Sequence, residues 1–127
     1  MNSMQNKKRW LDLADAEADA LIKALPAPLR ERLSGVSITF PARPSAADII
    51  EDGDDENLLG LFIGPAVCEE TMDGELSPEI RLFIGNILDE VDGDETAFLR
   101  EVRTTLLHEI GHYLGLDEDA LELRGLA

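Results

Sequence analysis

Residues 94–115 read DETAFLREVRTTLLHEIGHYLG, the longest stretch of the chain with a helical apolar pattern. Phe98, Val102, Leu106 and Ile110 recur every fourth position, so they share one face of a helix. Asp92 or Asp94 is a candidate N-terminal cap, and Gly115 is suited to end the helix after Leu114. The pattern predicts a long helix with one face buried in the core.

The same helix carries the string His-Glu-Ile-Gly-His over residues 108–112. His108 and His112 would lie about 40° apart around the helix axis, near enough for both imidazoles to bind one zinc ion. Glu109 projects about 100° from His108 and can reach a water on the metal without replacing it. The chain's only two histidines both lie in this string. It therefore predicts a zinc site with Glu109 as the catalytic base.

Zinc in such a site needs a third protein ligand, and no histidine is left to supply it. Gly115 can turn the chain straight back toward the metal, and Glu118 follows three residues later. Glu118 is the predicted third ligand, with Asp117 and Asp119 as alternatives. The single cysteine, Cys68, lies in an apolar stretch and is interpreted as a buried structural thiol.

The remaining pattern predicts an α+β fold, in which a small sheet of about three or more strands packs against an N-terminal helix and the long C-terminal helix. The expected helices cover residues 10–25, 29–33 and 119–123, and the expected strands cover residues 36–40, 58–63 and 79–84. Residues 41–57 are expected to be irregular. Residues 1–9 are expected as a disordered tail and residues 10–127 as a single domain.

Composition narrows the function classes. The net charge of −16 opposes binding to nucleic-acid phosphates, and no apolar run reaches the ~20 residues needed to cross a membrane. A single cysteine suits a reducing compartment, so a cytoplasmic location is expected. The acidic clusters near residues 52 and 92 lack the glycine that a calcium-binding EF-hand loop needs at its sixth position, so they are interpreted as solvated loops.

The string HEIGHYLGLDEDALELRGL, preceded by FLREVRTTLL, resembles the small bacterial zincin-like metallopeptidases called minimal zincins. The resemblance extends upstream through LLGLFIGP and IRLFIGNIL and covers roughly residues 25–126. It implies zinc ligands at His108, His112 and position 118, and a base at Glu109. The family more often has Asp at position 118. The third histidine and the methionine turn of the metzincins are absent.

The resulting hypothesis is a zinc metallopeptidase that hydrolyses a peptide or protein substrate. Zincins usually place an extended substrate along a sheet edge, and the strand at residues 79–84 is the candidate edge. Arg81, Arg103 and Tyr113 are the side chains left to stabilise an oxyanion, although Tyr113 is expected to pack instead. The alternative is a catalytically weak or inactive zinc-stabilised module whose acidic surface binds a basic partner.

Overall fold

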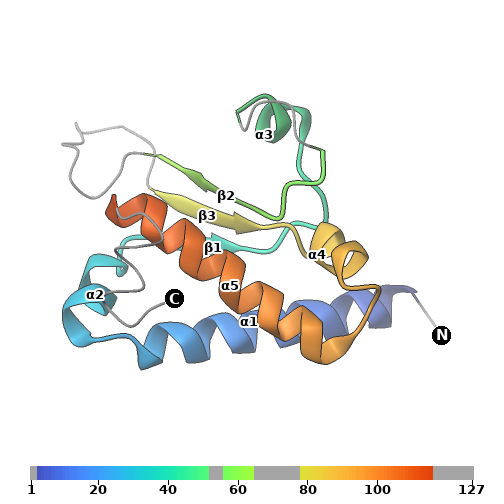
Figure 1. Cartoon of the computed structure of the whole chain (residues 1–127), viewed down its shortest axis with the longest axis horizontal. Coiled ribbons are helices and arrows are strands. Elements are labelled where there is room, and N and C mark those ends of the chain that lie inside the picture. Colours follow the sequence, from blue (N-terminus) through green and yellow to red (C-terminus); the bar gives the residue numbers. More distant parts are fainter. Residues whose placement is uncertain (1–2, 52–55, 65–77, 116–127) are drawn as a thin grey trace.

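The computed structural model describes residues 3–51, 56–64 and 78–115 (Figure 1). It confirms the α+β class, with a small sheet packed against an N-terminal helix and a long C-terminal helix. The elements in chain order are α1 (Ser3–Ala24), α2 (Ala27–Arg32), β1 (Ser37–Thr39), α3 (Ala46–Glu51), β2 (Gly60–Ile63), β3 (Glu79–Leu82), α4 (Ile84–Glu90) and α5 (Glu95–Leu114).

The sheet has three strands in the order β1-β3-β2. β1 pairs parallel to β3, and β2 pairs antiparallel to it with Gly60 opposite Leu82 and Phe62 opposite Ile80. The prediction that the strand at residues 79–84 forms the edge is wrong, because β3 is hydrogen-bonded on both sides. Its alternate residues Ile80 and Leu82 are fully buried, as a central strand requires. β2 and β1 are therefore the edges of the described sheet.

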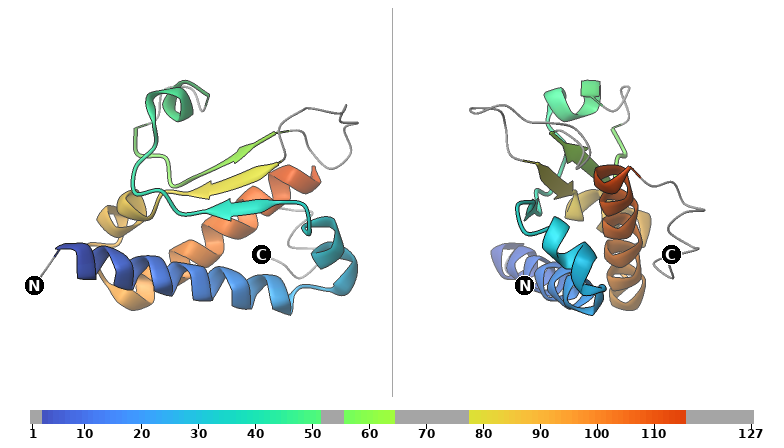
Figure 2. Two further views of the ribbon diagram at one scale, coloured as in Figure 1. Left: turned by 180° about the vertical axis from the view of Figure 1, so that it is seen from behind. Right: turned by 90° about the vertical axis from the view of Figure 1, so that its left-hand side faces the viewer.

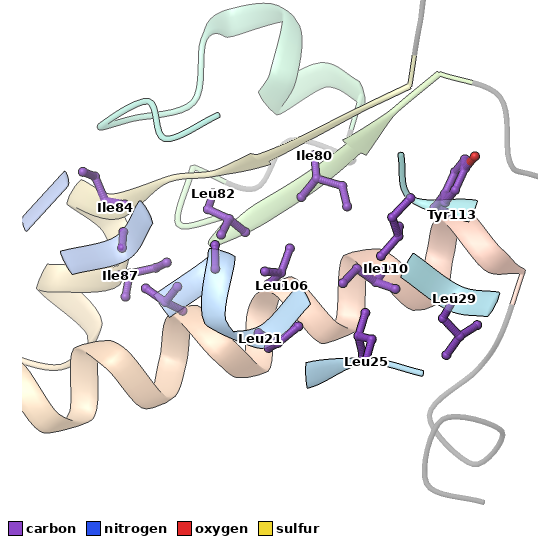
Figure 3. Packing of buried hydrophobic residues seen from close by; sticks show 14 of the residues in the cluster. Leu21, Leu25, Leu29, Ile80, Leu82, Ile84, Ile87, Leu106, Ile110 and Tyr113 are labelled. Carbon is purple, nitrogen blue, oxygen red and sulfur yellow. The ribbon is translucent and has the colours of Figure 1, made fainter. Parts of the chain in front are cut away.

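Helices α1 and α5 pack against each other and cover one face of the sheet (Figures 1 and 2). The core lies between these layers, where Leu21 of α1 and Leu106 and Ile110 of α5 meet Ile80 and Leu82 of the sheet (Figure 3). Each of these side chains is at most 2% exposed. Full burial of such a side chain stabilises the fold by about 1.5–3 kcal/mol, so this layer sets the relative placement of α5 and the sheet.

Helix α3 lies on the opposite face of the sheet, within a stretch expected to be irregular (Figure 1). Its N-terminus forms a capping box, in which the Asp48 backbone N–H donates to Ser45 Oγ and the Ser45 N–H donates to Asp48 Oδ2. The buried Asp48 also forms an ion pair with Arg81. Arg81 forms a second ion pair with Glu79, in which Nε lies 2.8 Å from Glu79 Oε2. The Arg81 hydrogen bond lowers the pKa of Glu79. This polar cluster attaches α3 to β3.

Helix α1 begins at Ser3 instead of Trp10, so residues 3–9, expected as a disordered tail, are helical. Two contacts with α5 explain the longer helix. Arg9 pairs with Glu95, and the Trp10 ring packs edge-on against Phe98 with centroids 4.8 Å apart. Contacts with another helix support a helix end that its own sequence pattern does not specify.

Helix α4 was not expected from the sequence. Its residue Asn86 holds the chain segment that leads into β2. The Asn86 side-chain amide donates to the carbonyl oxygens of Glu56 (3.0 Å) and Leu58 (2.8 Å), and its Oδ1 accepts from Arg43. The Phe83 N–H donates to the Leu59 carbonyl oxygen, which continues the ladder between the two chain segments. The chain thus enters β2 in a defined position.

The two ends of α5 agree with the sequence pattern. The Asp94 side chain accepts a hydrogen bond from the Ala97 N–H at 2.8 Å, and Gly115 adopts φ 73° directly after the helix.

Among the residues that the structure describes, no helix is long and apolar enough to cross a membrane.

Replacing Asn86 with Ala or Asp removes the amide that binds both carbonyl oxygens before β2. Because the Leu58 carbonyl is then left buried without its donor, we expect the free energy of unfolding to fall by about 1–3 kcal/mol in urea titration. Asp keeps the oxygen that faces Arg43, so the Asp variant separates the loss of the donor from the loss of the Arg43 contact. Wild-type stability in both variants would contradict this role.

Candidate metal centre

The core determines which side of α5 faces outward. Phe98, Val102, Leu106 and Ile110 are fully buried against the sheet and α1. This leaves His108 and His112 exposed on the side of the helix that faces β2. The two rings lie edge to face with centroids 4.4 Å apart.

His108, Glu109 and His112 form a compact group, with one potential ligand atom from each lying within 4.8 Å of the others. In residues 3–51, 56–64 and 78–115 it is the only group of three or more histidine, cysteine or carboxylate side chains this close. His112 Nδ1 lies 3.1 Å from Glu109 Oε1, within hydrogen-bond distance. If Nδ1 carries the proton, Nε2 keeps the lone pair that binds a metal.

Glu109 differs from the two histidines because it is only 5% exposed. Burial raises the pKa of its carboxyl, while the nearby imidazoles and a hydrogen bond from the Phe62 backbone N–H oppose that rise. The carboxylate is therefore held at the base of the site by contacts with α5 and with β2. A buried acid with a perturbed pKa beside two histidines is typical of a functional site.

Gly60 allows β2 to approach the helix at this point. A Cβ atom at position 60 would lie 2.6 Å from Thr105 Cγ2 and 3.3 Å from Glu109 Cγ. Any larger residue would push the strand away from α5. The glycine therefore sets the spacing between the edge strand and the buried carboxylate.

A cleft of about 410 Å³ runs between β2 and α5 and contains all three residues of the group. One wall is apolar and belongs to the chain at β2, and the other is polar and belongs to α5. The lining residues are Leu58, Leu59, Gly60, Leu61, Phe62, Glu101, Thr104, Thr105, His108, Glu109 and His112. A cleft of this size open to solvent can take several side chains of an extended peptide.

The donors present fit a zinc ion. Two imidazoles are a common part of a catalytic zinc set, and ligands at about 2.0–2.2 Å from one ion lie within about 4 Å of each other. The observed 4.8 Å limit is close to that spacing. His108 and His112 would hold the ion, since Glu109 is already engaged by the Phe62 N–H and His112.

The other predicted site residues lie elsewhere or are not described. Five sequence predictions fall outside the described residues: the third-ligand candidates Glu118, Asp117 and Asp119, the thiol of Cys68, and the helix expected at residues 119–123.

None of the three oxyanion candidates lines the cleft. Arg81 lies on the other face of the sheet with Asp48, and Arg103 pairs with Glu17 of α1. Tyr113 packs as expected, with its hydroxyl donating to the Arg32 carbonyl oxygen.

The sequence alone did not identify Gly60, Phe62 and Glu101 as parts of the site. A glycine inside the apolar run LLGLFI is a signal of close backbone approach. Glu101 precedes His108 by about two helical turns, which places both on one face of a helix. The backbone N–H of Phe62 carries no signal in the sequence.

Comparison with known families gives one match. A family described as zincin-like metallopeptidase matches residues 33–126, which is well over half of the chain and includes both histidines and Glu109. No curated protein matches the chain.

Replacing Gly60 with Ala should separate β2 from α5, because the new methyl group would overlap Thr105 Cγ2. We expect a loss of about 1–3 kcal/mol in the free energy of unfolding. Adding Thr105→Ala should recover part of this loss, which a double-mutant cycle in urea measures. Gly35→Ala is the control, since nothing lies within 4 Å of a Cβ there. If Gly60→Ala and Gly35→Ala changed the free energy of unfolding equally, this would contradict a close approach at Gly60.

Proposed function

The chain belongs to the zincin-like metallopeptidase family, and from this we propose that it is a zinc-dependent hydrolase that cleaves peptide bonds. The observation that carries the proposal is the position of Glu109, a buried carboxylate between two exposed histidines at the base of an open cleft. A binding module stabilised by zinc would need the two histidines but would have no use for a desolvated acid there.

His108 and His112 hold the metal in this proposal. When bound, zinc would lower the pKa of a water molecule and polarise the carbonyl of the substrate. Glu118 remains our proposed third ligand, with Asp117 and Asp119 as alternatives. The left-handed turn at Gly115 supports a carboxylate from this segment, because it ends α5 soon after His112 and changes the direction of the chain.

Glu109 acts as the base. It takes a proton from the attacking water and delivers it to the nitrogen of the leaving amine. The hydrogen bonds that the carboxylate accepts from the Phe62 N–H and from the His112 Nδ1–H orient it before the substrate arrives. Such orientation reduces the reorganisation needed during the reaction.

The edge of β2 that has no partner strand in the described sheet is the proposed binding surface for the substrate backbone. The Phe83 N–H donates to the Leu59 carbonyl oxygen, and the two strands are antiparallel. Because alternate residues of an antiparallel strand point their backbone groups to opposite sides, those of Gly60 and Phe62 point outward. The Phe62 N–H contact with Glu109 agrees with this alternation. Because the Phe62 N–H is engaged with Glu109, the backbone groups of Gly60 and the Phe62 carbonyl oxygen are the ones left to pair with a substrate. An extended peptide paired with them would pass the histidines.

We also propose that the protein acts on peptides or proteins and not on nucleic acid, and that it works in a reducing compartment such as the cytoplasm. The net charge of −16 and the single cysteine support these two points.

One observation favours the alternative of a zinc-stabilised module with a basic partner. Among the described residues that line the cleft, no arginine, lysine or tyrosine is present to stabilise an oxyanion.

The metal site is tested by mass spectrometry of untagged protein. We expect about one zinc per chain after incubation with zinc at neutral pH, and loss of the metal in the His108→Ala/His112→Ala double variant. Glu118→Gln should weaken zinc binding more than Asp117→Asn or Asp119→Asn if Glu118 is the third ligand. Failure of the wild-type protein to bind zinc would overturn the proposal.

Catalysis is tested with Glu109→Gln on a mixed peptide library read by mass spectrometry. We expect the variant to keep its zinc and its fold and to lose turnover by about 100-fold or more, because only proton transfer is removed. Glu90→Gln, an exposed carboxylate on α4, is the control for loss of one charge. A zinc-loaded wild-type protein that cuts no peptide would support the binding module instead.

A further inference from the structure

Resting on the proposed function, we propose that Glu101 is a specificity-determining residue that selects a lysine or arginine side chain on the carboxyl side of the cleaved bond. Glu101 lines the same cleft as His108, Glu109 and His112. It precedes His108 on α5 by about two turns, which places it roughly 10 Å from His108 along the helix axis. It therefore marks the far end of the cleft from the metal centre.

The charge of Glu101 is not neutralised within the described part of the chain. None of the ion pairs found there includes it, and its carboxylate accepts a hydrogen bond from the Thr105 hydroxyl at 3.5 Å. Arg103 is engaged with Glu17 of α1, and Arg100 does not line the cleft. Glu101 is half-buried, so a cationic side chain that reached it would form a partly desolvated pair.

The cleft wall opposite Glu101 suits the aliphatic part of a basic side chain. Leu58 and Leu59 lie directly before β2, and both line the cleft. Lysine and arginine carry an apolar stem below a charged end, so one side chain can contact this wall and the carboxylate together. A short acidic or polar side chain would gain neither contact.

The direction of the substrate follows from the relation between β2 and α5. Gly60 lies against Thr105 and Glu109, while the Phe62 ring lies 5.5 Å from that of Tyr113. The strand and the helix therefore run the same way, as Figure 1 shows. A peptide paired antiparallel to β2, the commoner arrangement, runs in the opposite direction. Its carboxyl-side residues then extend from the histidines toward Glu101.

The distances agree with a residue close to the cleaved bond. An extended chain advances about 3.3 Å per residue, so ~10 Å corresponds to about three residues. Side chains alternate between faces, and those that point toward α5 are the ones that can reach Glu101. The selected basic residue therefore lies within the first three after the cleaved bond.

The experiment uses three-residue peptides with a hydroxamate group attached to their amino end through a malonyl spacer. These compounds chelate zinc and are not hydrolysed, and their residues extend to the carboxyl side of the metal. All residues are alanine except one, which is either lysine or its neutral analogue norleucine, placed at each position in turn. Binding to the zinc-loaded protein is measured by calorimetry for the wild type, Glu101→Gln and Glu90→Gln. Glu90 is an exposed carboxylate on α4 outside the cleft, so Glu90→Gln controls for the change in net charge.

At one of the three positions we expect the lysine compound to bind about tenfold more tightly than the norleucine compound. The ratio should fall to about one in Glu101→Gln and stay unchanged in Glu90→Gln. A wild-type ratio near one at every position, or a preference that survives Glu101→Gln, would overturn the proposal. If Glu101→Gln does not fold, replacing lysine with acetyl-lysine on the wild-type protein must abolish the preference.

The outcome is separate from that of the peptidase test. Hydroxamate binding needs no turnover, so the ratio is decisive even for a protein that cleaves nothing. Peptide cleavage together with a lysine-to-norleucine affinity ratio of one would overturn only the role of Glu101. A ratio of about ten without peptide cleavage would overturn only the proposed peptidase activity.

Discussion

The packing of the apolar face of α5 against the sheet is the constraint on which the site depends. Phe98, Val102, Leu106 and Ile110 are fully buried and fix the rotation of the helix about its axis. This rotation also determines the direction in which every other side chain of the helix points. His108 and His112 face the cleft because the opposite side of their helix is held in the core. The geometry of the candidate metal centre is therefore a consequence of core packing more than of contacts between its own members.

A second constraint comes from the strand that faces the helix. Gly60 lets β2 lie against Thr105 and Glu109, and Asn86 holds the chain just before β2 through two carbonyl oxygens. Both act on the spacing between the strand and α5 and not on the histidines themselves. The Phe62 N–H reaches the Glu109 carboxylate only because this spacing is small. The Glu109 carboxylate is thus positioned by two elements.

Local signals in the sequence were enough for α5 and its motif, because helical periodicity, a cap at Asp94 and a stop at Gly115 all lie within one segment. They failed where the determinant is distant in sequence. The N-terminal turns of α1 depend on contacts of Arg9 and Trp10 with α5, and the order of the sheet depends on which strands pair. Helix α3 is a different case, since its start is specified by a local signal, the capping box of Ser45 and Asp48.

The distribution of burial on α5 separates stability from function, with one exception. The histidines are exposed and lie outside the apolar core, so the fold does not need imidazoles at these positions. Glu109 is buried, and a buried carboxylate opposes folding unless its hydrogen bonds offset the loss of water. An apolar residue at this position would suit the core better. A natural sequence keeps such a local conflict mainly where chemistry requires it, and here the conflict lies between the two histidines.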